Sequence, residues 1–114
     1  MKLKELAALL SLSALQSQGD SNVVVSGGYA SDLLSDVLAY GRAKNVWITC
    51  QIHQNIVAVA KLKDLAAIIL VNDRKPDEAT LRDAREENIL IYGTPEPSFA
   101  ISGKLYSALN KGVL

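Results

Sequence analysis

The chain has 114 residues, of which 49% are hydrophobic and 21% are charged, and its 12 basic and 12 acidic side chains give a formal net charge of zero. This length predicts one domain with one buried core over residues 1–114, and the composition excludes a wholly disordered protein. A neutral chain lacks the positive field from which nucleic-acid binding gains most of its affinity, so DNA and RNA are not expected partners. The one cysteine, Cys50, excludes an intramolecular disulfide and is expected to behave as a small hydrophobic residue.

The leucine-rich N-terminus predicts a helix rather than an export signal. An acidic residue, Glu5, comes early, and no small-residue cleavage site follows. A helix over residues 2–11 is predicted by four leucines on one stripe: Leu3, Leu6, Leu9 and Leu10. A short strand is expected near residues 14–16. No apolar run approaches the roughly 18 residues of a membrane span, so we expect a cytoplasmic protein with no membrane partner.

The stretch VVVSGGYASDLLSDVLAYG is typical of a strand, a glycine turn and a helix. The β-branched residues 23–25 predict a buried strand, which is ended by Gly27 and Gly28. Ser31 is expected to cap the following helix, and Gly41 to stop it. The glycine pair either only turns the chain or allows a ligand or a partner subunit close to the backbone. It matches neither GxxxxGK[ST] nor GxGxxG, two common phosphate-binding patterns.

From this point the chain alternates strands and helices. The predicted strands cover residues 46–50, 66–71 and 89–92, and the predicted helices cover residues 55–62, 76–88 and 98–110. A strand that is apolar throughout is expected to be covered on both faces. The βαβ alternation therefore predicts a single α/β domain, with a mainly parallel sheet and helices on both faces.

Loops that leave the carboxyl ends of parallel strands lie along one edge of the sheet, where ligands bind and helix N-termini offer free N–H groups. The four expected loops are residues 26–29, 51–54, 72–75 and 93–96. From these loops come nine candidate ligand-binding residues: Gly27, Gly28, Tyr29, His53, Gln54, Asn72, Asp73, Arg74 and Thr94. Arg74 or Lys75 would supply the countercharge for an anion.

His53 is the only histidine of the chain. It is interpreted as a hydrogen-bonding residue of a ligand site or interface, or as an ordinary loop residue. A catalytic role would require it to meet Asp73 or Glu96 across loops. No Cys or His cluster accompanies it, so no metal site, no cofactor and no catalytic residue is predicted. Asp32 and Asp36, one helical turn apart, are interpreted as a solvated helix face.

The segment VWITCQIHQNIVAVAKLKDLAAIILVNDRKPDEATLRDAREENILIYGT resembles the DRTGG domain, a small α/β module similar in fold to the N-terminal domain of HPr kinase/phosphorylase. The likeness is carried by Ile48-Thr49, by the apolar strand at 66–70 and by Pro76-Asp77-Glu78. It covers roughly residues 40–110, which leaves residues 1–40 as a leading helix and a first strand–helix unit. The Asp-Arg of the family would fall near Ile52-His53 and its Thr-Gly-Gly near residues 71–73, and this chain keeps neither.

The resemblance implies a regulatory or binding module, commonly a homodimer, which in some relatives is associated with adenine nucleotides. In HPr kinase/phosphorylase a separate P-loop domain does the catalytic work, and the present sequence has no such loop. We therefore expect a non-catalytic, ligand-sensing module that binds a small anion, such as an adenine nucleotide, at the strand ends. The alternative is a protein-interaction module without a small ligand, which docks onto a partner enzyme through residues 93–106.

Overall fold

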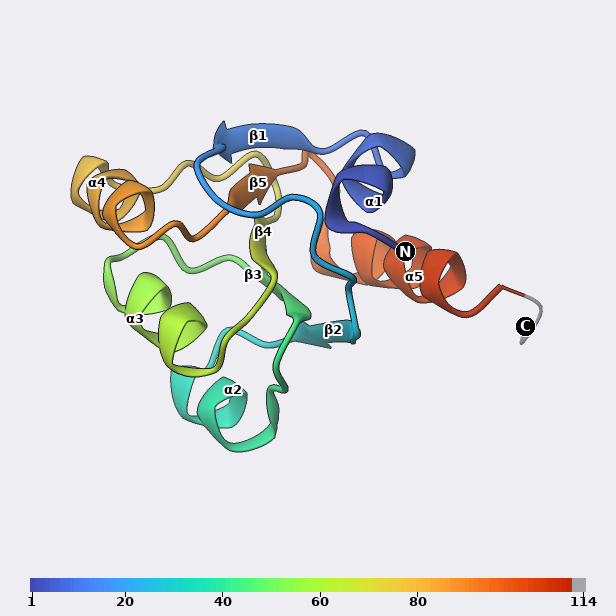
Figure 1. Cartoon of the computed structure of the whole chain (residues 1–114), viewed down its shortest axis with the longest axis horizontal. Coiled ribbons are helices and arrows are strands. Elements are labelled where there is room, and N and C mark those ends of the chain that lie inside the picture. The colour runs from blue at the N-terminus through green and yellow to red at the C-terminus, as the bar shows by residue number, and fades with distance from the viewer. Residues whose placement is uncertain (112–114) are drawn as a thin grey trace.

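The structure is a computed structural model of the chain that describes residues 1–111. Within this range one sheet has the strand order β1-β5-β4-β3-β2, and helices cover both of its faces (Figure 1). The elements, in chain order, are α1 (Leu3–Leu9), β1 (Ser13–Gln16), β2 (Gly27–Ala30), α2 (Leu34–Tyr40), β3 (Asn45–Thr49), α3 (Asn55–Leu62), β4 (Ala67–Leu70), α4 (Glu78–Glu86), β5 (Ile91–Gly93) and α5 (Ser98–Leu109). The predicted α/β fold with a mainly parallel sheet is confirmed.

The four strands from β2 to β5 are neighbours in sequence order and run parallel, whereas β1 pairs antiparallel with β5 at the far edge. The helices α2, α3 and α4, which connect these parallel strands, lie on one side of the sheet. The helices α1 and α5 lie on the other side (Figure 1). Because every parallel strand ends in the same direction, their outgoing loops share one end of the molecule.

Two hydrophobic clusters, one on each face of the sheet, form the core. Val46 and Ile48 of β3 face the cluster that contains α1 and α5, while Trp47 between them faces the cluster that contains α2, α3 and α4. This alternation is the ordinary two-residue period of a strand, hidden in the sequence because both faces are apolar. The Trp47 ring is fully buried, and its indole N–H donates to the Ser31 carbonyl at 2.8 Å.

The strand predicted over residues 23–25 is wrong. This segment bonds instead to the N-terminus, where the Leu3 N–H donates to the Val23 carbonyl and the Val25 N–H donates to the Met1 carbonyl, both at 2.9 Å. The strand that pairs with β3 is β2, which begins at Gly27. Intrinsic β propensity favours a strand at the valines 23–25, but the packing of α5 places the strand at residues 27–30 instead.

The glycine pair lies inside β2, so its interpretation as a turn is also wrong. A Cβ atom built on Gly28 would lie 2.6 Å from Cδ2 of Leu105 in α5. Glycine is therefore required for the close approach of a helix to the strand. The cap is shifted in the same way: Ser31 accepts a hydrogen bond from the Leu33 N–H, and Leu33 is itself the N-cap of α2.

The other predicted elements exist, with ends that differ by at most two residues, and Gly41 ends α2 as expected. The division of the chain at residue 40 stays a prediction. Among the described residues, no helix combines the length and the apolar character needed to cross a membrane.

Substitution by alanine should have opposite effects on stability at Gly28 of β2 and at Gly103 of α5. Gly28→Ala should lower the free energy of unfolding by about 1–2 kcal/mol, because its Cβ must displace the buried Leu105 side chain. Gly103→Ala should raise it by about 0.5–1 kcal/mol, because Gly103 lies within α5 and its Cβ would meet open space. Urea unfolding of both variants tests the packing, and equal effects of the two substitutions would contradict it.

Candidate functional site

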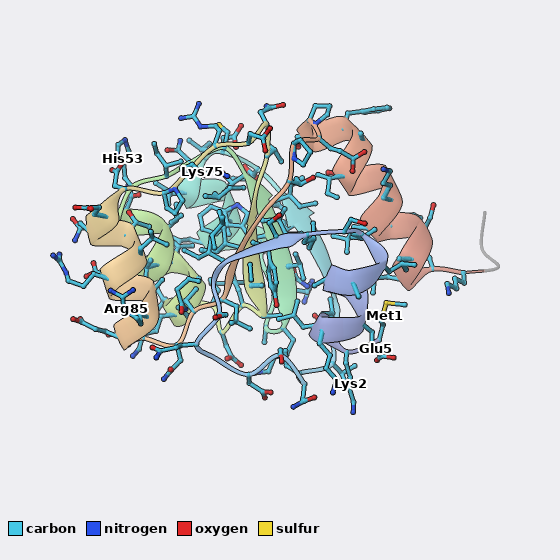
Figure 2. The ribbon with its side chains drawn as sticks, turned by 90° about the horizontal axis from the view of Figure 1, so that it is seen from above. Met1, Lys2, Glu5, His53, Lys75 and Arg85 are labelled. Atoms are coloured by element: carbon cyan, nitrogen blue, oxygen red, sulfur yellow. The ribbon has the colours of Figure 1, made fainter. Side chains whose placement is uncertain are left out.

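The loops after the four parallel strands form one rim, which we call the carboxyl-end rim: residues 31–33, 50–54, 71–77 and 94–97. Figure 2 shows His53 and Lys75 at this end of the molecule, whereas Lys2 and Glu5 lie at the opposite end. Three of the four predicted loops are thus confirmed in position. The first is corrected, since the loop after β2 begins at Ser31.

Six of the nine candidate residues lie on the carboxyl-end rim: His53, Gln54, Asn72, Asp73, Arg74 and Thr94. Gly27 and Gly28 do not, because Gly27 pairs with Asn45 at the start of β3 and thus lies toward the opposite end of the sheet. Tyr29 points to α2, where its hydroxyl donates to Oδ2 of Asp36 at 2.9 Å. Whether any of these residues binds a ligand stays a prediction.

Asp32 belongs to the rim, and the sequence analysis did not select it. Its Oδ1 accepts hydrogen bonds from the Thr49 hydroxyl at 2.9 Å and from the Cys50 N–H at 2.8 Å. Its carbonyl accepts a third from the Gln51 side chain at 3.0 Å. Asp32 therefore joins the loop after β2 to the loop after β3. The available signal was its place as the first acidic residue after GGYA, which is visible only once GGYA is recognised as a strand.

The charge of Asp32 is stabilised where it lies. Burial alone would raise the pKa of the Asp32 carboxyl, but the hydrogen bonds from Cys50 and Thr49, together with the nearby charge of Arg74, hold that pKa below its ordinary value of 3.8. Burial and the Asp32 carboxylate raise the pKa of the Cys50 thiol above its ordinary value. Cys50 is thus kept as a neutral thiol, in line with its interpretation as a small hydrophobic residue.

The loop after β4 has a constrained backbone. Asn72 and Asp73 have φ values of 56° and 57°, and they occupy the positions where the DRTGG resemblance expects two glycines. Asn and Asp enter this left-handed region more readily than other non-glycine residues. The backbone shape that glycine pairs favour is thus kept here by two polar residues.

The N–H groups of this loop are not free, contrary to the expectation from the sequence. The Asn72 N–H donates to the Glu96 carbonyl at 3.0 Å, and the Asp73 N–H donates to the Thr94 carbonyl at 2.9 Å. The Arg74 N–H donates to the Val71 carbonyl at 3.1 Å. These bonds tie the loop after β4 to the loop after β5. A ligand at this point must therefore be bound by side chains rather than by these amides.

Arg74 and Lys75 are the two cations of the rim that have no ion-pair partner among residues 1–111. Both side chains are exposed. Nearby, Nδ1 of His53 lies 2.8 Å from Oδ2 of Asp77 and Lys104 bonds to Glu96, whereas the exposed carboxylate of Asp73 forms no ion pair within residues 1–111. His53 therefore contacts neither Asp73 nor Glu96 as a catalytic role would require. The rim thus combines two adjacent cations that form no ion pair with several carboxylates, of which Asp32 is stabilised by hydrogen bonds and Asp73 is exposed.

A groove of about 960 Å³ adjoins the rim at Thr94 and Glu96 and continues between the end of α1 and α5. Its most exposed apolar side chain is Phe99, which is 93% accessible, and Leu9 of α1 is 54% accessible. Gly103 lies in the same groove with open space above it. The groove thus combines exposed apolar side chains with charged ones at its border, Glu96, Lys104 and Lys111.

No protein-family model and no curated protein matches the chain. Among solved structures, the fold is similar to that of the regulatory region of a Clostridium perfringens pyrophosphatase, which comprises CBS and DRTGG domains and was crystallised with its activator, diadenosine tetraphosphate. The TM-score is 0.65 at 18% identity, over 91% of the present chain and 45% of the pyrophosphatase region. The chain thus spans less than half of that region.

A likeness at this level of identity shows the fold. It fits the expected DRTGG-like architecture, because the region that matches contains a DRTGG domain. The likeness to HPr kinase/phosphorylase stays a prediction.

The hydrogen bonds of Asp32 predict an acid-sensitive contribution to stability. Because the pKa of Asp32 is lower in the folded than in the unfolded chain, this contribution is complete above the unfolded value near 3.8 and is lost as the pH falls below it. Asp32→Asn should cost about 1 kcal/mol at pH 7, and the difference from the wild type should shrink progressively as the pH falls below 3.8.

Urea unfolding at pH 7, 5, 4 and 3 measures this difference. Glu86→Gln is the matched control, since Glu86 is an exposed carboxylate of α4 for which no hydrogen bond or ion pair is recorded. A constant difference between wild type and Asp32→Asn across the pH range would show that the carboxylate charge does not matter.

Proposed function

We propose that the chain is a non-catalytic regulatory module that binds a small anionic ligand, an adenine nucleotide, at the carboxyl-end rim. The observation that carries the proposal is the adjacent pair Arg74 and Lys75, neither of which forms an ion pair among the described residues, although Arg74 lies near enough to Asp32 to lower the pKa of its carboxyl. Two such cations repel each other, so a phosphate group that neutralises both is favoured. Arg74 offers the planar donor geometry that suits phosphate oxygens.

The rim also suits the uncharged part of a nucleotide. Asp32 is held as a carboxylate beside Arg74, and a carboxylate near a phosphate site is suited to accept hydrogen bonds from ribose hydroxyls. A phosphate would thus lie over Arg74 and Lys75 and a ribose toward Asp32. Of the other rim candidates, Gln54 is exposed, with its side-chain amide donating to Asp83, whereas Thr94 is buried.

The regulatory role is supported by the kind of protein that shares the fold. The pyrophosphatase region is a regulatory one, and an adenine dinucleotide is named as its activator. Adenine nucleotides are therefore the first ligands to test. A kinase activity is not proposed, because the sequence contains no P-loop pattern.

Binding is tested by thermal shift and calorimetry with ATP, AMP, diadenosine tetraphosphate and inorganic phosphate. A ligand at 100 times its Kd should raise the free energy of unfolding by about 2.7 kcal/mol. The double variant Arg74→Ala/Lys75→Ala should weaken binding by roughly tenfold or more, since each cation lost removes a charge-assisted contact.

The matched control is Lys2→Ala/Lys4→Ala, which removes the same charge at the start of α1 and should leave binding unchanged. Figure 2 shows Lys2 at the end of the molecule opposite to Lys75. The proposal fails if no probe stabilises the chain at millimolar concentration. It also fails if the two double variants weaken binding equally, because the effect would then be one of net charge.

The second candidate function is a protein-interaction module that docks onto a partner enzyme through the groove between α1 and α5. It is favoured by Phe99, whose side chain is 93% exposed beside a rigid Pro95-Glu96-Pro97 loop. An exposed aromatic side chain at the mouth of an apolar groove is typical of interface anchors.

Phe99→Ser should leave the free energy of unfolding within about 0.5 kcal/mol of the wild type, because the ring is not buried. It should at the same time abolish capture of a partner enzyme by the immobilised chain, as measured by quantitative pull-down. Capture that is unchanged by Phe99→Ser would exclude this groove as the docking surface.

A further inference from the structure

The strand β2 forms an open edge of the sheet. Within residues 1–111, β2 pairs with β3 alone (Figure 1). The Ala66 N–H donates to the Asn45 carbonyl and the Val71 N–H donates to the Thr49 carbonyl, so alternate residues of β3 bond toward β4. The residues between them, Val46 and Ile48, are thus the ones that bond to β2.

Gly28 and Ala30 are the residues of β2 that point away from β3. The Ser31 N–H donates to the Ile48 carbonyl at 3.1 Å. Because the bonding direction alternates along a strand, Tyr29 also bonds toward β3, whereas Gly28 and Ala30 bond in the opposite direction. No backbone hydrogen bond to a segment beyond this edge is recorded for either residue within the described chain. Each therefore presents an N–H donor and a C=O acceptor side by side at the open edge.

A groove of about 550 Å³ runs along this edge, between β2 and α5. Its volume is within the range of about 300–1,000 Å³ that small-molecule sites occupy. No acidic or basic side chain lines the groove, and Gly28 and Ala30 are part of its wall. A neutral ligand that matches an adjacent donor and acceptor is therefore favoured over an ion.

The Ser102 hydroxyl of α5 belongs to the same groove and lacks a partner. Ser102 lines the groove, and its Oγ is shielded from solvent and forms no hydrogen bond within residues 1–111. A buried hydroxyl without a partner is unfavourable, and most buried polar groups in proteins are bonded. Because a hydroxyl rotates to suit its partner, a polar ligand atom beside Ser102 would satisfy it.

An exposed aromatic ring lies at the groove. Tyr106 of α5, which is 52% accessible, lines it together with Met1, which is 38% accessible. Aromatic side chains and methionine make favourable contacts with flat rings. Together with the donor and acceptor groups of the edge, these side chains favour a flat heterocycle as the ligand.

We infer that the groove between β2 and α5 binds the nucleobase of the nucleotide, with the polar edge of the base against Gly28 or Ala30 and its face against Tyr106. The choice of adenine rests on the proposed function. The amino group of adenine donates and the neighbouring ring nitrogen accepts, so this base complements a residue whose C=O and N–H point the same way. The Ser102 hydroxyl donates to a further ring nitrogen.

The groove lies within reach of the carboxyl-end rim. Ala30 and Asp32 are two residues apart, so their Cα atoms are separated by at most about 7 Å. Arg74 lies near enough to Asp32 to affect the pKa of its carboxyl. A base beside Ala30, a ribose at Asp32 and a phosphate at Arg74 thus follow one another in the order of a nucleotide. The neutral groove supplies the concave surface that the exposed cations do not.

Calorimetry with adenosine tests the base site separately from the cations, because adenosine carries no phosphate. Adenosine should bind the wild type and Arg74→Ala/Lys75→Ala with similar Kd. Purine riboside, which lacks the amino group of adenosine, should bind roughly tenfold more weakly. In amide NMR spectra adenosine should shift the signals of Gly28 and Ala30, whereas inorganic phosphate should shift those of Arg74 and Lys75.

Three variants test the groove itself. Ser102→Ala and Tyr106→Ser should each weaken the binding of adenosine and AMP about fivefold, and Ala30→Leu, which fills the groove, roughly tenfold or more. Ser102→Ala should not lower the free energy of unfolding, because it removes a hydroxyl that has no partner in the free chain. Tyr40→Ser is the matched control, since Tyr40 is an exposed tyrosine of α2 outside the groove, and it should leave binding unchanged.

The outcomes separate this inference from the proposed function. AMP binding that is weakened by Arg74→Ala/Lys75→Ala but unchanged by all three groove variants overturns the inference and leaves the cationic site in place. Adenosine that binds the groove while phosphate adds no affinity supports the inference and contradicts the cationic site. Equal binding of adenosine and purine riboside, or no shift of the Gly28 and Ala30 signals by adenosine at millimolar concentration, also overturns it.

Discussion

The pairing of β2 with β3 determines where the polar side chains of the carboxyl-end rim lie. Two contacts fix its register: Gly28 lies directly beneath Leu105 of α5, and the Trp47 indole holds the Ser31 carbonyl at the strand end. A shift of one residue would place a side chain under α5 and turn Tyr29 away from Asp36. With the register fixed, Asp32 falls on the carboxyl-end rim, and the glycines fall on the open edge. The packing of β2 against α5 thus determines that Asp32 lies on the carboxyl-end rim.

The sequence is informative where both faces of a strand are buried. The runs that form β3 and β4 are apolar throughout, and no other segment competes for their places, so their existence and direction could be predicted. The two-layer arrangement of helices follows from the same alternation. The apolar stripes of the helices were equally visible, and the predicted starts of α3 and α5 agree with the structure. The starts of α2 and α4 lie about two residues later than predicted, because no side chain caps either helix.

The strand β2 and the residue Asp32 could not be predicted for a physical reason. Residues 23–25 have a higher intrinsic strand preference than GGYA, but they are held by the N-terminal residues and supply one core side chain, Val25. The glycines are needed by α5, which lies about eighty positions further along the chain. Long-range contacts of this kind leave no local pattern. The loops after β3, β4 and β5 were placed at the rim from the sequence because those strands were predicted.

The hydrogen bonds between the loops after β4 and β5 have a mechanical consequence. Asn72 and Asp73 are bound to the carbonyls of Glu96 and Thr94, and α5 begins two residues after Glu96. A displacement of the loop after β4 is therefore transmitted to the loop after β5 and to the first turn of α5. The C-terminal part of α5 packs on β2, where Leu105 contacts Gly28. The helix α5 in this way connects the loop that carries Arg74 and Lys75 to the strand β2 at the edge of the sheet.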